Sequence, residues 1–209
     1  HLDHFGLAAE IRKAAGFKIS CFIHEQDLWC LSAEYILEEM FGKEAEAFMA
    51  SAGLPQEERD SIRRRFSSFA DLFDPLEGVC SMKDGDTFMG EGYRLRVIHT
   101  PGHTPGSCCI YESEQKILFS GDHIIGHITP NPLVVLNRKR LKDPAYQSLE
   151  TYLDSLERLE NLNVQFVFPG HGDYVEDLSG IVASYRVHHR ERMDLVWNAL
   201  REKAGPLFK

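Results

Sequence analysis

Four short segments of this chain place histidine or aspartate beside glycine or at the start of a helix, and this pattern limits its function more than any other feature. They are His1–His4 (HLDH), Thr100–Ser107 (TPGHTPGS), Phe119–His123 (FSGDH) and Pro169–Gly172 (PGHG). The last three come directly after predicted strands, and the first opens a predicted helix. Glycine permits sharp turns and close approach of a ligand, and loops at strand ends are where a rigid scaffold presents reactive side chains.

Imidazole and carboxylate groups together suit zinc, and also iron or manganese. A single histidine at a strand end is more often a structural residue, so the inference depends on the four segments occurring together. The candidate ligands exceed the three or four protein ligands that one zinc ion takes. We therefore expect two metal ions that share a bridging group. The candidates are His1, Asp3, His4, His103, Asp122 and His171.

The composition excludes several classes of protein. The 209 residues carry a formal net charge of -9, which disfavours binding to the phosphate backbone of nucleic acids. The chain lacks an apolar run long enough for a membrane span, so we expect none. Its five cysteines include no Cys-x-x-Cys pair and are interpreted as small buried residues in a reducing compartment, which predicts a cytoplasmic protein.

The hydrophobic pattern switches repeatedly between helical and strand spacing, which is typical of an α/β fold. Turn signals such as Asp84-Gly85-Asp86 separate the elements. We expect helices over residues 3–15, 143–161 and 177–203, the last with a break near Gly180. We expect strands over residues 18–24, 93–99, 108–111, 116–120 and 164–168.

Residues 26–74 differ from the rest of the chain in composition. They are rich in Glu, Ala, Arg, Met and Phe and contain one break at Gly53-Leu54-Pro55. We expect two or three helices here, forming an insertion after the first helix–strand unit. Two roles are open: an appendage that only packs against the sheet domain, or a lid over a pocket.

The four segments resemble the signature of the metallo-β-lactamase-fold hydrolase superfamily, in which H-x-H-x-D-H precedes a P-G-H-T-x-G turn, a G-D aspartate and a G-H histidine. His1–His4 corresponds to the second half of the first motif, and the other segments follow in the same order up to His171. The resemblance implies an α/β fold over residues 1–209, an αββα sandwich of two mixed β-sheets flanked by helices. It also implies that the chain is N-terminally incomplete, because a strand and a leading histidine would precede His1.

The resemblance implies a role for each candidate ligand. Asp122 would bridge two divalent metal ions, most simply zinc, with iron or manganese as alternatives. A hydroxide bound by the metal ions would attack the substrate, and Asp3 would act in catalysis by orienting it or transferring its proton. The expected ligands of the first ion are His1 and His103 with the upstream histidine, and those of the second are Asp3, His4 and His171.

Two further histidines are candidates for contact with substrate. His127 follows Asp122 by five residues, in the region where the family builds its pocket. His188 lies in the predicted C-terminal helix, from which it could reach an anionic group on the substrate. The alternative for both is an ordinary packing or solvent-facing histidine.

The resemblance leaves several reactions open. Hydrolysis of a small-molecule thioester, ester or lactone, as in the glyoxalase II-like and lactonase-like branches, agrees with the acidic charge. A nuclease or phosphodiesterase of the same fold would rely on the basic run Asn137–Lys142, and a persulfide dioxygenase would use a single iron. The expected partner is therefore a small-molecule substrate, with nucleic acid disfavoured and a homodimer left open.

Overall fold

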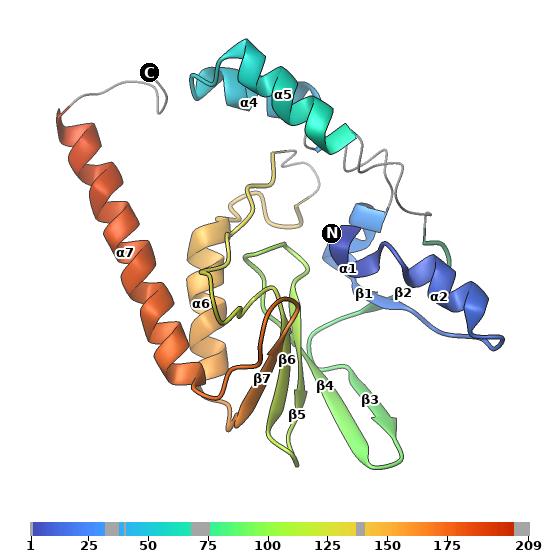
Figure 1. The fold of residues 1–209 in the computed structure, drawn as a ribbon. Coiled ribbons are helices and arrows are strands. Elements are labelled where there is room, and N and C mark those ends of the chain that lie inside the picture. The colour runs from blue at the N-terminus through green and yellow to red at the C-terminus, as the bar shows by residue number, and fades with distance from the viewer. Residues whose placement is uncertain (1, 32–37, 40, 68–75, 137–140, 203–209) are drawn as a thin grey trace.

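The computed structural model describes residues 2–31, 38–39, 41–67, 76–136 and 141–202. It contains a five-stranded sheet, two helices that cover one face of this sheet, and an N-terminal part with a second sheet (Figure 1). The helices are α1 (Leu2–Phe5), α2 (Ala8–Ala14), the 3-10 helix η1 (Glu25–Leu31), α4 (Lys43–Ser51), α5 (Gln56–Ser67), α6 (Ser148–Glu160) and α7 (Leu178–Glu202). The strands are β1 (Phe22–His24), β2 (Cys80–Met82), β3 (Thr87–Gly90), β4 (Tyr93–His99), β5 (Cys108–Glu112), β6 (Ile117–Gly121) and β7 (Phe166–Pro169).

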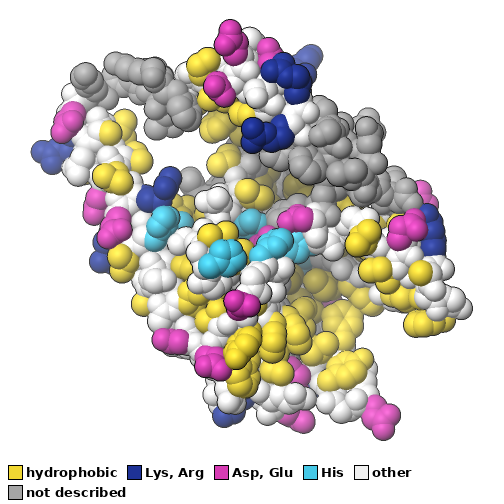
Figure 2. All heavy atoms as spheres, viewed as in Figure 1, with side chains coloured by type: hydrophobic (Ala, Val, Ile, Leu, Met, Phe, Trp, Pro, Cys, Tyr) yellow, Lys and Arg dark blue, Asp and Glu magenta, His cyan; other side chains and the backbone are white. Residues whose placement is uncertain are grey.

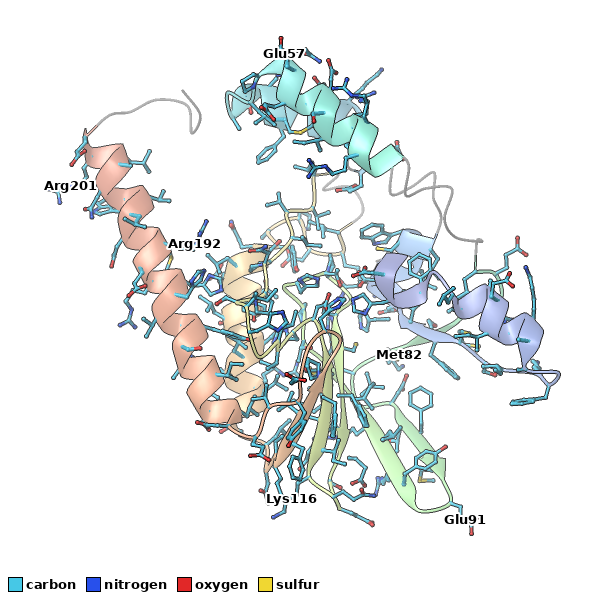
Figure 3. All side chains as sticks on the ribbon, in the orientation of Figure 1. Glu57, Met82, Glu91, Lys116, Arg192 and Arg201 are labelled. Atoms are coloured by element: carbon cyan, nitrogen blue, oxygen red, sulfur yellow. The ribbon has the colours of Figure 1, made fainter. Side chains whose placement is uncertain are left out.

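The five-stranded sheet has the order β3-β4-β5-β6-β7. Neighbours from β3 to β6 pair antiparallel, whereas β6 and β7 are parallel and are joined through α6, as a parallel pair requires a crossover. Strands β4, β6 and β7 therefore run in the same direction, and their carboxyl ends share one edge. The hairpin turns that contain Glu91 and Lys116 lie at the opposite edge (Figure 3).

Helices α6 and α7 cover one face of this sheet (Figure 1). Along α6, Tyr152, Leu156 and Leu159 recur at helical spacing and are fully buried against the sheet. Each such side chain contributes about 1.5–3 kcal/mol through the apolar surface that it removes from water. The sheet contributes alternate residues to the same core, among them Cys109, Leu118 and Val167.

The second sheet consists of β1 and β2, which pair in parallel. Two ring contacts link it to the larger sheet: Phe22 meets Phe88 at a centroid distance of 4.7 Å, and His24 stacks on His99 at 4.0 Å with an interplanar angle of 9°. The prediction of an α/β fold with two sheets and helices outside them is confirmed.

Three predicted helices have different bounds in the structure. The predicted helix 3–15 is divided into α1 and α2 at Gly6-Leu7. The helix predicted from Asp143 begins only at Ser148, because Asp143 accepts hydrogen bonds from the backbone N–H groups of Ala145 and Tyr146 and so forms a local turn. The break expected near Gly180 is wrong, because Asp177 caps the first turn of α7 by accepting the Gly180 N–H at 2.8 Å.

The described part of residues 26–74 is mainly helical, with most of η1 followed by α4 and α5. Residues 32–37, 40 and 68–74 of this stretch lie outside the described residues. Figure 1 places α4 and α5 beyond the edge of the sheet at which β4, β6 and β7 end. The expectation of a helical insertion is consistent with these elements, and its role as a lid stays a prediction.

Two expectations from composition can be compared with the structure. Within the described ranges, no helix combines the length and the apolar character that crossing a bilayer requires. All five cysteines are free thiols, but only Cys30 and Cys109 are buried; Cys80 is exposed and Cys21 and Cys108 are half-buried, so the expectation that all are buried is wrong. Cys109 is fully buried on the core face of β5, and burial raises its pKa to about 12, which keeps it protonated and unreactive at neutral pH.

The stacked His24 predicts that the protein loses stability in mild acid. Burial, together with the charge of the adjacent His99, lowers the pKa of His24 from 6.5 to about 4. Between these two pKa values the unfolded chain binds a proton that the folded chain does not. The contribution of neutral His24 to the free energy of unfolding is therefore fully present above pH 6.5 and is lost as the pH falls towards 4. The loss should reach up to about 1.4 kcal/mol per pH unit.

Urea unfolding of the wild type and of His24→Phe, measured from pH 7 to pH 4, tests this expectation. Phenylalanine retains an aromatic ring against His99 but cannot bind a proton. The free energy of unfolding of the variant should therefore depend less steeply on pH than that of the wild type. Equal slopes for the two proteins would contradict the role assigned to His24.

Candidate metal centre

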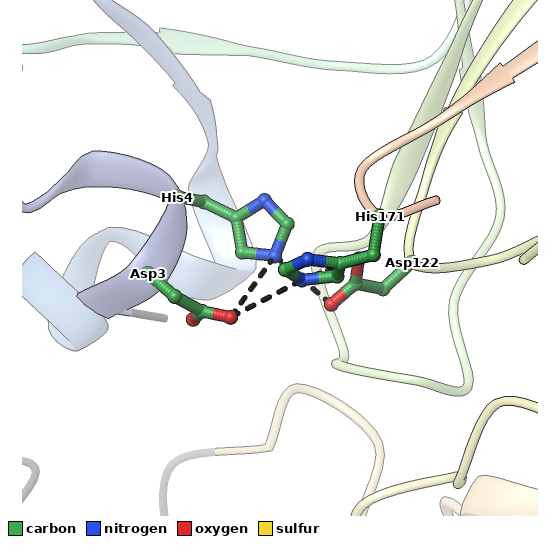
Figure 4. A group of neighbouring side chains, drawn as sticks. All are labelled: Asp3, His4, Asp122 and His171. Carbon is green, nitrogen blue, oxygen red and sulfur yellow. Dashed lines mark hydrogen bonds and ion pairs between the residues drawn. The ribbon is translucent and has the colours of Figure 1, made fainter. Parts of the chain in front are cut away.

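The five predicted ligands among the described residues meet where three strands end and one short helix begins. Asp122 directly follows β6, His171 follows β7 by one glycine, and His103 lies in the loop after β4. These three strands run in the same direction, so the loops that follow them lie at the same edge of the sheet. Helix α1 supplies Asp3 and His4 from a different part of the chain (Figure 4). Residues from four distant segments thus share one site.

The central group consists of Asp3, His4, Asp122 and His171. One ligand atom from each of these residues lies within 4.8 Å of all the others. His4 Nε2 lies 2.9 Å from Asp122 Oδ2, and His171 Nε2 lies 3.2 Å from Asp3 Oδ2 and 3.5 Å from Asp122 Oδ1 (Figure 4). Asp122 thus faces both histidines, and nitrogen and oxygen atoms converge on one small volume.

His103 approaches the same oxygen of the Asp122 carboxylate as His4 does. Its Nε2 is 3.5 Å from Asp122 Oδ2, and its Nδ1 is 2.8 Å from the carbonyl oxygen of Asn131. A carbonyl only accepts hydrogen bonds, so Nδ1 carries the proton and Nε2 keeps its lone pair towards Asp122. Burial lowers the pKa of His103, which favours this neutral form. The ring is therefore held in the state that binds a metal ion.

The charges of the group favour a bound cation. The Asp122 side chain is 8% exposed; burial acts to raise its pKa, but the hydrogen bond from His4 and the charges of the nearby histidines bring it below the ordinary value. The pKa of His4 is raised, first by its hydrogen bond to Asp122. The protonated form of His4 is thus favoured beside the carboxylate, and a divalent ion bound there would compete with that proton.

Gly170 makes room for this arrangement. A Cβ atom at this position would lie 2.6 Å from Asp122 Oδ1 and 2.8 Å from the His4 ring. Both distances are shorter than the contacts that a Cβ atom makes in proteins. Glycine is therefore needed here, because the side chains of Asp122 and His4 approach the backbone closely. This agrees with the glycine that precedes His171 in the sequence pattern.

The family of the chain follows from a comparison with known proteins. A model of the metallo-beta-lactamase superfamily matches residues 1–171, a range that includes every predicted ligand. The chain belongs to the metallo-beta-lactamase superfamily. Proteins of this superfamily bind divalent metal ions, and the donor set of the four-residue group, two imidazoles and two carboxylates, fits such ions.

Two fungal relatives of this superfamily member match a little under two thirds of the chain. The "Lactamase-like protein aptB" of Emericella nidulans is 30% identical over 61% of this chain and 37% of its own length. The "Atrochrysone carboxyl ACP thioesterase" of Aspergillus chevalieri is also 30% identical, over the same shares of the two chains. The chain thus spans little more than a third of the length of these curated relatives.

A solved structure supports the fold of this superfamily member. A beta-lactamase domain protein from Burkholderia ambifaria superposes with a TM-score of 0.76 at 24% sequence identity. The match covers 96% of this chain and 55% of that protein. The likeness extends over nearly all of the fold described above.

Three other predicted site residues of this metallo-beta-lactamase superfamily chain, His1, His127 and His188, are not part of the four-residue group. His1 lies outside the described residues. His127 is exposed and lies beside the His171 loop, because a Cβ on Gly172 would come within 2.6 Å of its Nδ1. His188 is half-buried on α7, where its ring meets His189 edge-on at 5.5 Å, and it is not part of the four-residue group. Figure 2 shows histidine side chains gathered in the middle of one face of the molecule.

The sequence analysis missed Asp27, which hydrogen-bonds to the loop that carries His103. A signal was present, because Asp27 follows strand β1 by three residues, much as Asp122 and His171 follow theirs. It was counted instead as part of the helical insertion at residues 26–74. Its place among the residues that support the site is visible only once the two segments are brought together.

Gly170→Ala should weaken metal binding without unfolding the protein. The added methyl group displaces Asp122 or His4, and changes to groups that only support metal ligands already cost about 10–100-fold in affinity. In a titration with zinc, we expect the affinity of the variant to fall by at least about tenfold. Its circular dichroism spectrum should be unchanged.

Gly126→Ala is the matched control, because its Cβ would meet only a methyl group of Val175, at 3.2 Å, and the Asp173 carbonyl oxygen, at 3.7 Å. This variant should bind zinc like the wild type. Wild-type affinity in Gly170→Ala would show that the close approach of Asp122 and His4 to the backbone is unimportant.

Proposed function

We propose that the protein is a metal-dependent hydrolase that cleaves a small-molecule thioester and uses two divalent metal ions, with zinc as the first candidate. The convergence of Asp3, His4, Asp122 and His171 within 4.8 Å carries the proposal. The thioester is suggested by the Aspergillus chevalieri relative, which is named as an ACP thioesterase. Esters and lactones, whose carbonyl carbon reacts in the same way, belong to the same proposed substrate class.

The ligands divide into two sets around Asp122. His103 would bind the first ion together with His1, as the resemblance of the motif implies. Asp122 would bridge both ions, since its Oδ2 is approached by His4 and His103 and its Oδ1 by His171. These donors match two sites better than one, because one zinc ion takes only three or four protein ligands. The ligands of the second ion would be Asp3, His4 and His171.

When bound, divalent ions lower the pKa of a coordinated water to about 7 and polarise a carbonyl oxygen. The residues of the chain position the reacting groups and move the proton. The Asp3 side chain is 55% exposed and faces His171 and His4, so one of its carboxylate oxygens could accept the proton of the attacking water. Asp3 would return this proton to the leaving thiolate, which needs little assistance because a thiol has a pKa of only about 8.5.

Several parts of the molecule are proposed to select the substrate. His127 is exposed beside the His171 loop and could contact the acyl or thiol portion, and His188 is kept as a second candidate. Helices α4 and α5 of the insertion at residues 26–74 would cover the site as a lid. The five free thiols agree with a cytoplasmic setting, where disulfides are rare. A homodimer stays a prediction.

Asp122→Asn should lose the bridge between the two metal sites. Truncation of groups that only support a ligand costs about 10–100-fold, so loss of a shared ligand should reduce thioester hydrolysis by at least about 100-fold. Metal analysis should give close to two ions per chain for the wild type, on the order expected of a dinuclear site, and fewer for the variant. Asp173→Asn, which changes an exposed carboxylate outside the four-residue group, should retain full activity and metal content.

A substrate panel distinguishes the proposed reaction from its alternatives. Metal-loaded protein is assayed with acyl-pantetheine thioesters, lactones, a phosphodiester and glutathione persulfide, before and after removal of metal by a chelator. Thiol release from the thioesters that stops on metal removal supports the proposal. Preferential cleavage of the phosphodiester, or oxygen consumption with the persulfide, would assign the chain to another reaction, and activity that survives metal removal would contradict the metal-dependent mechanism.

A further inference from the structure

Asp27 is a buried carboxylate that the proposed reaction does not use. It lies in η1, is 8% exposed, and both of its oxygens accept hydrogen bonds from the loop after β4. Its Oδ2 lies 2.5 Å from the Thr104 hydroxyl, and its Oδ1 lies 2.8 Å from the Gly106 backbone nitrogen. These two residues are more than seventy positions away from Asp27 in the sequence. The carboxylate thus joins the N-terminal part of the chain to the loop that presents His103.

The hydrogen bonds around Asp27 have a consistent direction. The Thr104 hydroxyl donates to Asp27 and lies 2.9 Å from the Ser107 hydroxyl, which can donate to it in turn. Ser107 Oγ accepts the Thr104 backbone N–H at 3.0 Å. The loop therefore carries a short series of donors that ends at the carboxylate, and a charged acceptor makes such bonds stronger than neutral ones.

Packing also adapts this loop to the carboxylate. A Cβ on Gly106 would lie 2.5 Å from Asp27 Cγ, so only glycine leaves space for the side chain. Burial raises the pKa of Asp27, and the bonds from Thr104 and Gly106 act against this change. A buried carboxylate is costly unless it is hydrogen-bonded, and here the loop supplies that compensation. This site is therefore built for a carboxylate.

The same loop is held from its other sides as well. The Ser155 hydroxyl of α6 donates to the Pro101 carbonyl oxygen at 2.7 Å, and the Leu133 N–H donates to the His103 carbonyl oxygen at 3.1 Å. The His103 ring donates to Asn131. Asp27 holds the Thr104–Gly106 half of the loop, directly after His103, and it is not one of the four clustered ligands.

We propose that Asp27 is a positioning residue that fixes the loop 100–107 so that His103 Nε2 faces Asp122. The inference rests on the proposed function, because it takes His103 as a metal ligand. Asp27 acts through Thr104 and Gly106 and touches neither the substrate nor the metal ions. Its loss therefore loosens one ligand of one ion and leaves the ligands of the other ion in place.

The test compares Asp27→Ala and Thr104→Val with the wild type in three measurements: stepwise zinc affinity, hydrogen exchange of the Gly106 amide, and melting temperature. Asp27→Ala should weaken the binding of one zinc ion by about 10–100-fold, the usual effect of removing a group that orients a ligand, and leave the other ion unaffected. The Gly106 amide should exchange faster even without metal, since its acceptor is gone. Thr104→Val keeps that bond and should show a smaller loss of affinity.

Two variants serve as matched controls. Thr104→Ser retains the hydroxyl and should bind zinc like the wild type. Glu25→Gln changes an exposed carboxylate of the same 3-10 helix that pairs with Lys142 rather than with the loop, and it should also behave like the wild type. If Asp27→Ala fails to fold, the comparison of Thr104→Val with Thr104→Ser still tests whether the hydrogen bond to Asp27 affects zinc affinity.

Wild-type affinity for both ions in Asp27→Ala and Thr104→Val would overturn the inference and leave the proposed function intact. An equal loss of both ions, in proportion to a fall in melting temperature, would also overturn it, because Asp27 would then be only structural. A wild type that binds no zinc, iron or manganese would overturn the proposed function itself, and that result is visible without any variant.

Discussion

The structure depends on a nearly buried carboxylate, Asp122, surrounded by three imidazoles at the end of β6. A buried negative charge is stable only if cationic or hydrogen-bonding groups compensate for its lost hydration. His4 supplies a hydrogen bond at 2.9 Å, and His103 and His171 lie 3.5 Å away. The three imidazoles around this carboxylate are also proposed ligands of the divalent ions. The fold therefore brings the proposed ligands together without a bound ion.

Much of this arrangement could be predicted from the sequence because it depends on local signals. Two short, mainly apolar strands, each followed by glycine and then aspartate or histidine, predict the positions of both Asp122 and His171. Their shared edge then follows from the parallel pairing of β6 with β7. Helix bounds were less predictable where a side chain competes with the backbone: Asp143 delays the start of α6, and Asp177 accommodates Gly180 within α7.

The residues that hold the ligands in place could not be predicted in the same way, because their partners are distant in the sequence. Asp27 and Glu39 both belong to the stretch interpreted as an insertion. Asp27 binds the loop of His103, and Glu39 accepts the Leu136 N–H at 2.7 Å, a few residues beyond the Asn131 carbonyl that orients His103. Among the described residues, the insertion thus contacts the His103 loop through Asp27 and the segment after Asn131 through Glu39, so removing it entirely would disturb the His103 loop as well as any lid.

The central claim, that Asp122 bridges two metal ions, is tested most directly by anomalous diffraction from crystals of the metal-loaded protein. We expect two anomalous peaks about 3.5–4 Å apart, both next to the Asp122 carboxylate, with His103 at the first and His4 and His171 at the second. A single peak with Asp122 outside its coordination sphere, or no peak among these residues, would contradict it.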